Sequence, residues 1–76
     1  SEMCKETVNI VSAIKKINNS ICLIGGKEHP YIEDVINDYK EFNPAIEDAY
    51  IPNTTCLPQL EAPDKFVKLV NIFLHA

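Results

Sequence analysis

Residues 63–74 have the sequence PDKFVKLVNIFL. A proline followed by an acidic residue is typical of the first turn of a helix, where a missing N–H costs little and negative charge is favoured. Apolar side chains then cover most of the circumference, leaving only Lys65, Lys68 and Asn71 as polar positions. Because a helix that is apolar on most sides is buried on most sides, we predict a helix here. It forms either an interface between subunits or the central helix of a monomer.

Three further helices are predicted upstream. Apolar residues recur at helical spacing from Met3 to Ile17 and predict a first helix that extends as far as Cys22, where Gly25-Gly26 ends it. Pro30 precedes a second amphipathic segment with acidic residues in its first turn. Asn43-Pro44 resembles an N-cap and first helical position, and predicts a short third helix to Ala49 or Tyr50. We expect residues 52–63 to be a connector with little regular structure.

These elements predict an all-α fold class, a single helical domain over residues 1–76 built as a bundle of about four short helices. A chain of 76 residues buries a small share of its surface and usually needs a disulfide, a metal or a partner. Since 46% of its residues are hydrophobic, apolar side chains remain after a monomer core is filled. We therefore expect association as a dimer.

The charge pattern and the length of the apolar runs exclude two classes of partner. The net charge is −4, the seven basic residues are all lysines, and they are scattered along the chain. Nucleic-acid binding requires clustered positive charge and commonly arginine, so we expect no nucleic-acid partner. No apolar run approaches the length that spans a bilayer, so we also expect no membrane insertion.

No residue pattern predicts an enzyme, a metal site or a cofactor. His29 and His75 lie far apart, and neither has a cysteine at ligand spacing. The adjacent pairs Glu33/Asp34 and Glu47/Asp48 would point about 100° apart on a helix and would not converge on a substrate. We therefore predict a protein that acts by binding.

The cysteines and glycosylation motifs favour an extracellular protein. Small secreted domains often use disulfides, and this chain has three cysteines. Cys4 and Cys22 would lie too far apart on one helix to bond, so Cys22 and Cys56 are candidates for an intrachain disulfide. Cys4 is then a candidate for an interchain bond or simply a free thiol. Asn18 and Asn53 begin N-glycosylation sequons. Without a visible hydrophobic leader, we expect either the mature form of a secreted protein or a cytosolic one.

Part of the chain resembles a known family. The run Cys22-Leu-Ile-Gly-Gly-Lys-Glu-His-Pro-Tyr31-Ile-Glu-Asp-Val35, followed by Tyr39-Lys-Glu-Phe42, resembles the end of helix one and the second helix of the secretoglobin (uteroglobin-like) family. Ala45-Ile-Glu-Asp-Ala49 and Cys56-Leu57 resemble its third helix and mid-chain cysteine. The resemblance covers about Cys22 to Leu74.

The resemblance implies four short helices per subunit, two disulfide-linked subunits, secretion and an apolar cavity that holds a small hydrophobic ligand of steroid or lipid type. It implies that Tyr31 faces this cavity and that Cys4 bonds to the second subunit, a copy of the same or a related chain. Candidate ligand-binding residues are Val11, Ile14, Tyr31, Val35 and Phe66. The principal alternative is a small secreted signalling peptide, cytokine-like or pheromone-like, that binds a cell-surface receptor. A cytosolic interaction module with reduced thiols is a third.

Overall fold

The computed structural model describes residues 9–76 and shows a mixed α/β fold. In chain order the elements are β1 (Val11–Lys15), β2 (Ser20–Gly26), α2 (Ile32–Phe42), β3 (Glu47–Ile51), α3 (Pro58–Glu61) and α4 (Pro63–Leu74). The predicted all-α fold is therefore wrong, and so is the four-helix bundle that the secretoglobin resemblance implies. The three strands form one sheet in the order β1-β2-β3.

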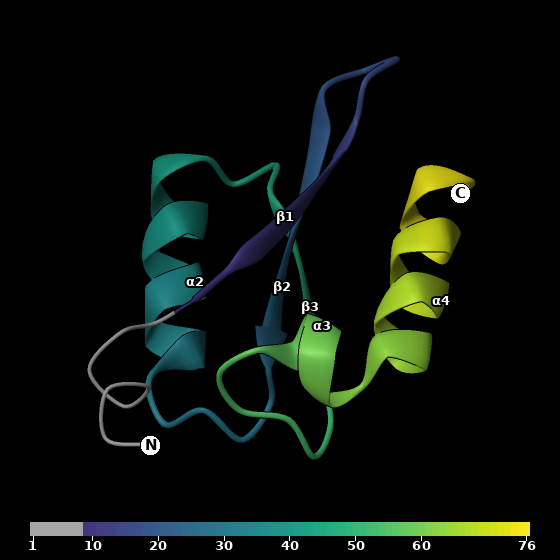
Figure 1. Ribbon diagram of the computed structural model, residues 1–76. Coiled ribbons are helices and arrows are strands. Elements are labelled where there is room, and N and C mark those ends of the chain that lie inside the picture. The colour runs from purple at the N-terminus through teal and green to yellow at the C-terminus, as the bar shows by residue number, and fades with distance from the viewer. Residues whose placement is uncertain (1–8) are drawn as a thin grey trace.

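The central strand of this sheet is β2. It pairs antiparallel with β1, with Ala13 opposite Cys22, and parallel with β3, with Ile24 opposite Ala49. A parallel connection needs a crossover, and α2 supplies it between β2 and β3. Figure 1 shows the sheet between the two long helices, with α2 on one face and α4 on the other.

Each face of the sheet has its own core. On the α2 face the buried residues are Leu23, Ile32 and Ile36, and Tyr50 packs against them. On the α4 face the buried residues are Ala13, Cys22, Ile24 and Ile51, and they contact the half-buried apolar side chains of α4, namely Phe66, Leu69, Val70 and Phe73. Successive residues of β2 thus alternate between two apolar layers, which is why this strand is an unbroken hydrophobic run.

The predicted first helix is wrong over its described part, where a β-hairpin stands instead. Asn18-Asn19 forms the turn: Asn19 adopts a left-handed backbone with φ 58°, and the Asn18 side chain accepts a hydrogen bond from the Ser20 N–H at 3.0 Å. Asparagine tolerates both roles well. The flanking β-branched residues fit a sheet. Residues 3–8 of the predicted helix lie outside the described residues.

The predicted third helix is also wrong, because residues 47–51 form strand β3. Asn43 has extended backbone at the end of α2, and its side chain accepts a hydrogen bond from the Ala45 N–H at 3.1 Å. Ile46 and Tyr50 then pack on the α2 face, while Ala49 and Ile51 pack on the α4 face. This two-residue alternation is the period of a strand.

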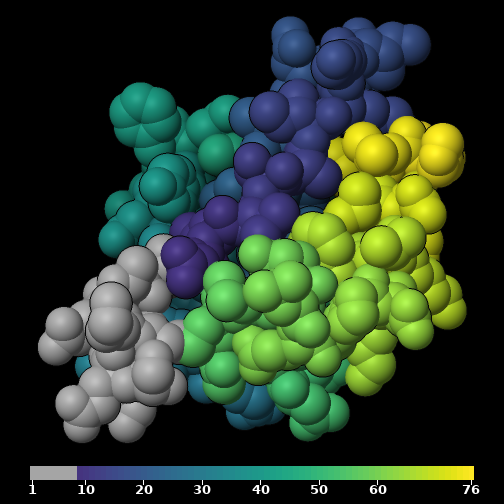
Figure 2. Space-filling view, viewed as in Figure 1, coloured from purple at the N-terminus to yellow at the C-terminus, as the bar shows by residue number. Residues whose placement is uncertain are grey.

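The two long predicted helices are confirmed. α2 begins two residues after Pro30 and has Glu33 and Asp34 in its first turn, and α4 begins at Pro63. The connector holds one short helix, α3, that the sequence did not predict. The space-filling view in Figure 2 shows the tip of the β1–β2 hairpin projecting beyond the rest of the molecule, beside the C-terminal end of α4.

Gly25 and Gly26 do not end a helix; they end β2, where other segments pass very close. A Cβ on Gly25 would overlap the side chain of Ile32 in α2. A Cβ on Gly26 would overlap backbone atoms of Thr55 and lie 2.8 Å from the carbonyl oxygen of Thr54. The glycine pair therefore permits close packing at the C-terminal end of the central strand.

Candidate functional site: a groove between β3 and α4

A groove lies between α4 and the part of the sheet formed by β2 and β3. Its volume is about 410 Å³. Its lining combines the β-hairpin, β3 and the last turns of α4, namely Lys15, Asn18, Ser20, Cys22, Glu47, Asp48, Ala49, Leu69, Ile72, Phe73 and Ala76. α4 contacts β1 extensively. Because the helix covers that side of the sheet, the side next to β3 stays open.

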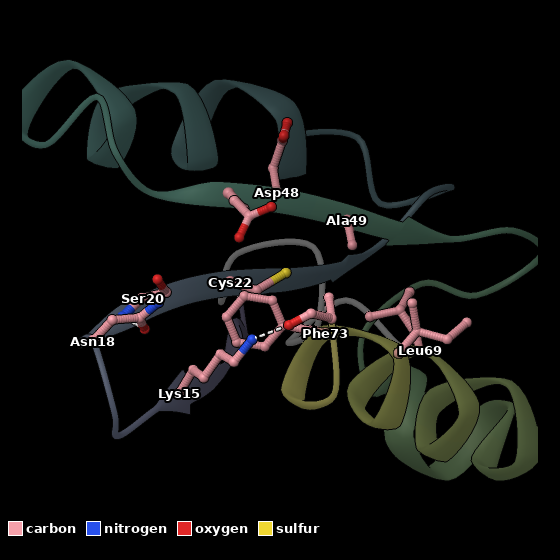
Figure 3. Close-up of a pocket in the computed structure, with 11 residues that line it drawn as sticks. Lys15, Asn18, Ser20, Cys22, Asp48, Ala49, Leu69 and Phe73 are labelled. Carbon is pink, nitrogen blue, oxygen red and sulfur yellow. Dashed lines mark hydrogen bonds between the residues drawn. The ribbon is translucent and has the colours of Figure 1, made fainter.

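The apolar wall of the groove comes from α4. Leu69 and Phe73 are half-buried and also contact the core, whereas Ile72 is 63% exposed. Figure 3 shows Leu69 and Phe73 reaching from α4 toward the strands, with Cys22 on the floor and Asp48 above it on β3. The wall of the groove is therefore apolar, and the floor of the groove is partly polar.

Cys22 forms part of the floor as a buried free thiol. Burial raises its pKa, and the nearby carboxylates of Glu47 and Asp48 raise it further. A thiol held protonated in this way is a poor nucleophile and a poor metal ligand. The groove therefore offers no activated cysteine.

The predicted Cys22–Cys56 disulfide is wrong, because Cys22 is free. The prediction placed both residues beside loops, but Cys22 lies inside the central strand, in the core of the α4 face. No disulfide joins two of the residues from 9 to 76, and Cys56, which is not a free thiol, is not bonded to Cys22. The interchain bond predicted for Cys4 falls on a residue outside this range.

Two of the polar groups at the groove are already engaged. The Lys15 ammonium donates a hydrogen bond to the main-chain carbonyl oxygen of Ala76, which ties the hairpin to the end of α4 (Figure 3). Asp48 forms an ion pair with Lys40 of α2 at 3.1 Å. Tyr50 donates a hydrogen bond to Asp48, and burial, followed by this carboxylate, raises the Tyr50 pKa. Asp48 therefore fastens β3 to α2.

A second hollow of about 300 Å³ continues along the same helix. It is lined by the end of β3 and the first turns of α4, namely Tyr50, Ile51, Pro52, Lys65, Lys68, Leu69 and Ile72. Because Leu69 and Ile72 line both spaces, the two hollows adjoin along one face of α4. We call the combined space the β3–α4 groove.

The structure separates the residues predicted to bind a ligand. Val11 and Phe66 are half-buried and pack against the same core on the α4 face. Ile14 is exposed on β1, and Tyr31 is exposed at the start of α2, with its ring edge-on to His29. Val35 is half-buried on α2 and lines a hollow with Asp38, Tyr39 and Phe42. The five side chains therefore do not line one cavity, and none of them lines the β3–α4 groove.

One flank of α2 is a second apolar surface. Phe42 is 92% exposed, and Tyr39 and Tyr31 are each about half exposed. Val35, Asp38, Tyr39 and Phe42 line a shallow hollow there. The adjoining side of the helix, with Ile32 and Ile36, is buried on the sheet.

The other predicted features have clear positions. Asn18 and Asn53 are both exposed, one in the hairpin turn and one in the turn after β3, so their glycosylation stays a prediction. Among the described residues no three histidine, cysteine or acidic side chains are grouped closely enough to hold a metal ion. Within residues 9–76 no helix has the length and apolar character needed to cross a bilayer.

Comparisons of the chain with protein-family models, curated proteins and solved structures give no match.

The groove could not be found from the helical interpretation of the sequence. Cys22, Glu47 and Ala49 come together only when β2 and β3 are recognised as neighbouring parallel strands. The available signal was the run Ile21–Ile24 between Asn18-Asn19 and Gly25-Gly26, because a short apolar run between turn residues is typical of a buried strand.

Proposed function

We propose that this chain is a non-enzymatic binding protein that holds a small hydrophobic molecule in the β3–α4 groove. The observation that carries the proposal is the pair of adjoining hollows along one apolar side of α4, which share Leu69 and Ile72. Binding sites for small molecules are typically concave, largely apolar and roughly 300–1,000 Å³ in volume. The larger hollow alone, at about 410 Å³, falls in this range.

The chemistry of the lining favours binding over catalysis. The pKa of the Cys22 thiol is raised, the Lys15 ammonium bonds to a main-chain carbonyl, and Asp48 is paired with Lys40. A catalytic base or nucleophile must have a pKa tuned toward neutral pH, and it must have a neighbouring group that orients it. The Lys15 and Asp48 side chains are engaged in other bonds and the Cys22 thiol is protonated. These states support a role in binding rather than in catalysis.

The shape of the groove favours an elongated ligand with one polar end. An apolar body would lie along Leu69, Ile72 and Phe73, where water is displaced from apolar surface. A hydroxyl or carbonyl at the other end would lie near Asn18 and Ser20 in the hairpin. Steroid-like and lipid-like molecules fit this description.

A neutral fluorescent hydrophobic dye, Nile red, tests the proposal by titration. We expect saturable binding to the natural sequence and at least about fivefold weaker binding to Ile72→Ser, since a lost apolar contact is worth about 1 kcal/mol or more. Ile72 is 63% exposed, so the helix tolerates the change. The matched control is Phe42→Ser, which alters the exposed flank of α2 and should leave the affinity unchanged.

The opposite pattern would contradict the groove as the site. If Phe42→Ser weakens dye binding and Ile72→Ser does not, the exposed aromatic side of α2 is the binding surface. That result would favour the alternative function, a signalling peptide that binds a receptor, because exposed aromatic residues commonly anchor protein–protein contacts. No saturable binding by any variant would reject the carrier function.

A further inference from the structure

The outer edge of β3 is open. In the sheet order β1-β2-β3 this strand has β2 on one side, and no strand of residues 9–76 pairs with it on the other. An edge strand presents unpaired N–H and C=O groups, which readily pair with another chain. The β3–α4 groove opens onto this same edge.

We infer that β3 pairs antiparallel with β3 of a second copy of this chain, with Ala49 opposite the partner's Ala49. The pairing would join two three-stranded sheets into one six-stranded sheet related by a two-fold axis. It would place the two β3–α4 grooves side by side on one face, between the two α4 helices. The inference goes beyond the proposed function and needs no bound ligand.

The charges on β3 select this register. Glu47 and Asp48 lie at one end of the strand, and Tyr50 and Ile51 lie at the other. With Ala49 on the two-fold axis, Glu47 lies opposite the partner's Ile51, and Asp48 lies opposite the partner's Tyr50. Parallel in-register pairing would instead place each carboxylate beside its own copy, which is destabilising. The strand is therefore complementary to itself in the antiparallel direction only.

The charges on α4 complement the same arrangement. α4 runs opposite to β3, as Figure 1 shows. Lys65 and Lys68 line the same hollow as Tyr50 and Ile51, whereas Phe73 lines the hollow that includes Glu47. Glu47 shares the α4 side of the strand with Ala49 and Ile51, because side chains alternate. The partner's Glu47, placed opposite Ile51, therefore comes to the end of the groove that carries Lys65 and Lys68. Because of the two-fold symmetry, the same attraction forms twice in the dimer.

The exposed apolar surface of α4 also favours a second copy of the chain as the partner. Ile72 lines both hollows and is 63% exposed, and no residue of α4 is fully buried. A second copy would shield part of this surface from water and would contribute its own α4 as the far wall of the combined groove. Association of this kind buries apolar area and leaves the charged residues at its rim.

Charge exchange tests the inference by sedimentation equilibrium without ligand. We expect a reversible dimer that weakens as salt is added. Glu47→Lys should raise the dimer dissociation constant by about tenfold, because it faces Lys65 and Lys68 of the other copy. Combining it with Lys65→Glu and Lys68→Glu should restore most of the affinity. Glu41→Lys, the same charge change on α2, should leave the dissociation constant unaltered.

Three results would overturn the inference. They are a monomer at every concentration, failure of the triple variant to regain affinity while its circular dichroism stays native, or equal weakening by Glu47→Lys and Glu41→Lys. Because dye binding and self-association are measured separately, a monomer that still binds Nile red in an Ile72-dependent manner rejects the dimer and keeps the carrier function. A dimer that binds no dye keeps the inferred pairing and rejects the carrier function.

Discussion

At the residue scale, Glu61 organises the connector between β3 and α4. Its carboxylate accepts hydrogen bonds from the Leu57 N–H at 2.9 Å, from the Thr55 N–H at 3.1 Å and from the Thr55 hydroxyl at 3.1 Å. Leu57 is the N-cap of α3, so the side chain satisfies a donor that the helix leaves unpaired. These bonds, that from Leu57 foremost, lower the pKa of Glu61.

Neutralising Glu61 should destabilise the protein in a pH-dependent way. We expect Glu61→Gln to lower the free energy of unfolding by about 1 kcal/mol at neutral pH, as for the loss of a helix-capping bond. The pKa of Glu61 in the folded protein lies below its ordinary value. The stability that the carboxylate adds is therefore complete when the pH is above the ordinary pKa, and it is lost as the pH falls through the pKa of the folded protein.

Urea unfolding of both proteins at a series of pH values checks this expectation. The difference in stability between the natural sequence and Glu61→Gln should shrink in acid. Glu41→Gln, an exposed change on α2, is the control and should have little effect at any pH. A difference between Glu61→Gln and the natural sequence that persists unchanged in acid would show that the carboxylate charge is not responsible.

At the scale of the elements, other segments pass very close to the C-terminal end of β2. A methyl group on Gly26 would meet backbone atoms of Thr54 and Thr55, which cannot move without shifting the connector. A methyl group on Gly25 would meet the side chain of Ile32. A side chain can adopt another rotamer more readily than a backbone can move, so the two positions differ in tolerance.

We therefore expect Gly26→Ala to cost about 3 kcal/mol of stability and Gly25→Ala to cost less, within the range of about 1–3 kcal/mol for overpacking. Thermal unfolding followed by circular dichroism measures both. Ser12→Ala, an exposed change on β1, is the control for a small side-chain change in the sheet away from these contacts. Equal stability of the natural sequence and Gly26→Ala would mean that the connector does not pack as described.

The elements also show which parts of the sequence were predictable. α2 and α4 were found because each has a 3.6-residue apolar period, an acidic first turn and a proline at or two residues before its first residue. The hairpin was missed because β-branched residues at Val11, Ile14 and Ile17 imitate helical spacing. Only the Asn18-Asn19 turn contradicts that interpretation locally.

At the scale of the whole molecule, the remaining features depend on contacts between distant segments. β3 is a strand because it pairs with β2 more than 20 residues earlier, and the sequence of Glu47–Ile51 is equally compatible with a short helix. The groove has the same origin, since its walls come from the hairpin, β3 and α4. That the last helix contributes to an interface between subunits stays a prediction.

The projecting β-hairpin has a consequence for cleavage by proteases. Lys16 is exposed at the start of the tip, whereas Lys15 is tied to the end of α4, and protruding loop tips are preferred sites of nicking. Brief treatment with trypsin should therefore cut after Lys16 before any other lysine of residues 9–76, as mass spectrometry would show. The two fragments should stay together, because β1 and β2 remain paired on the core side of the cut. Early cleavage after Lys68 instead would mean that α4 opens more readily than the hairpin tip.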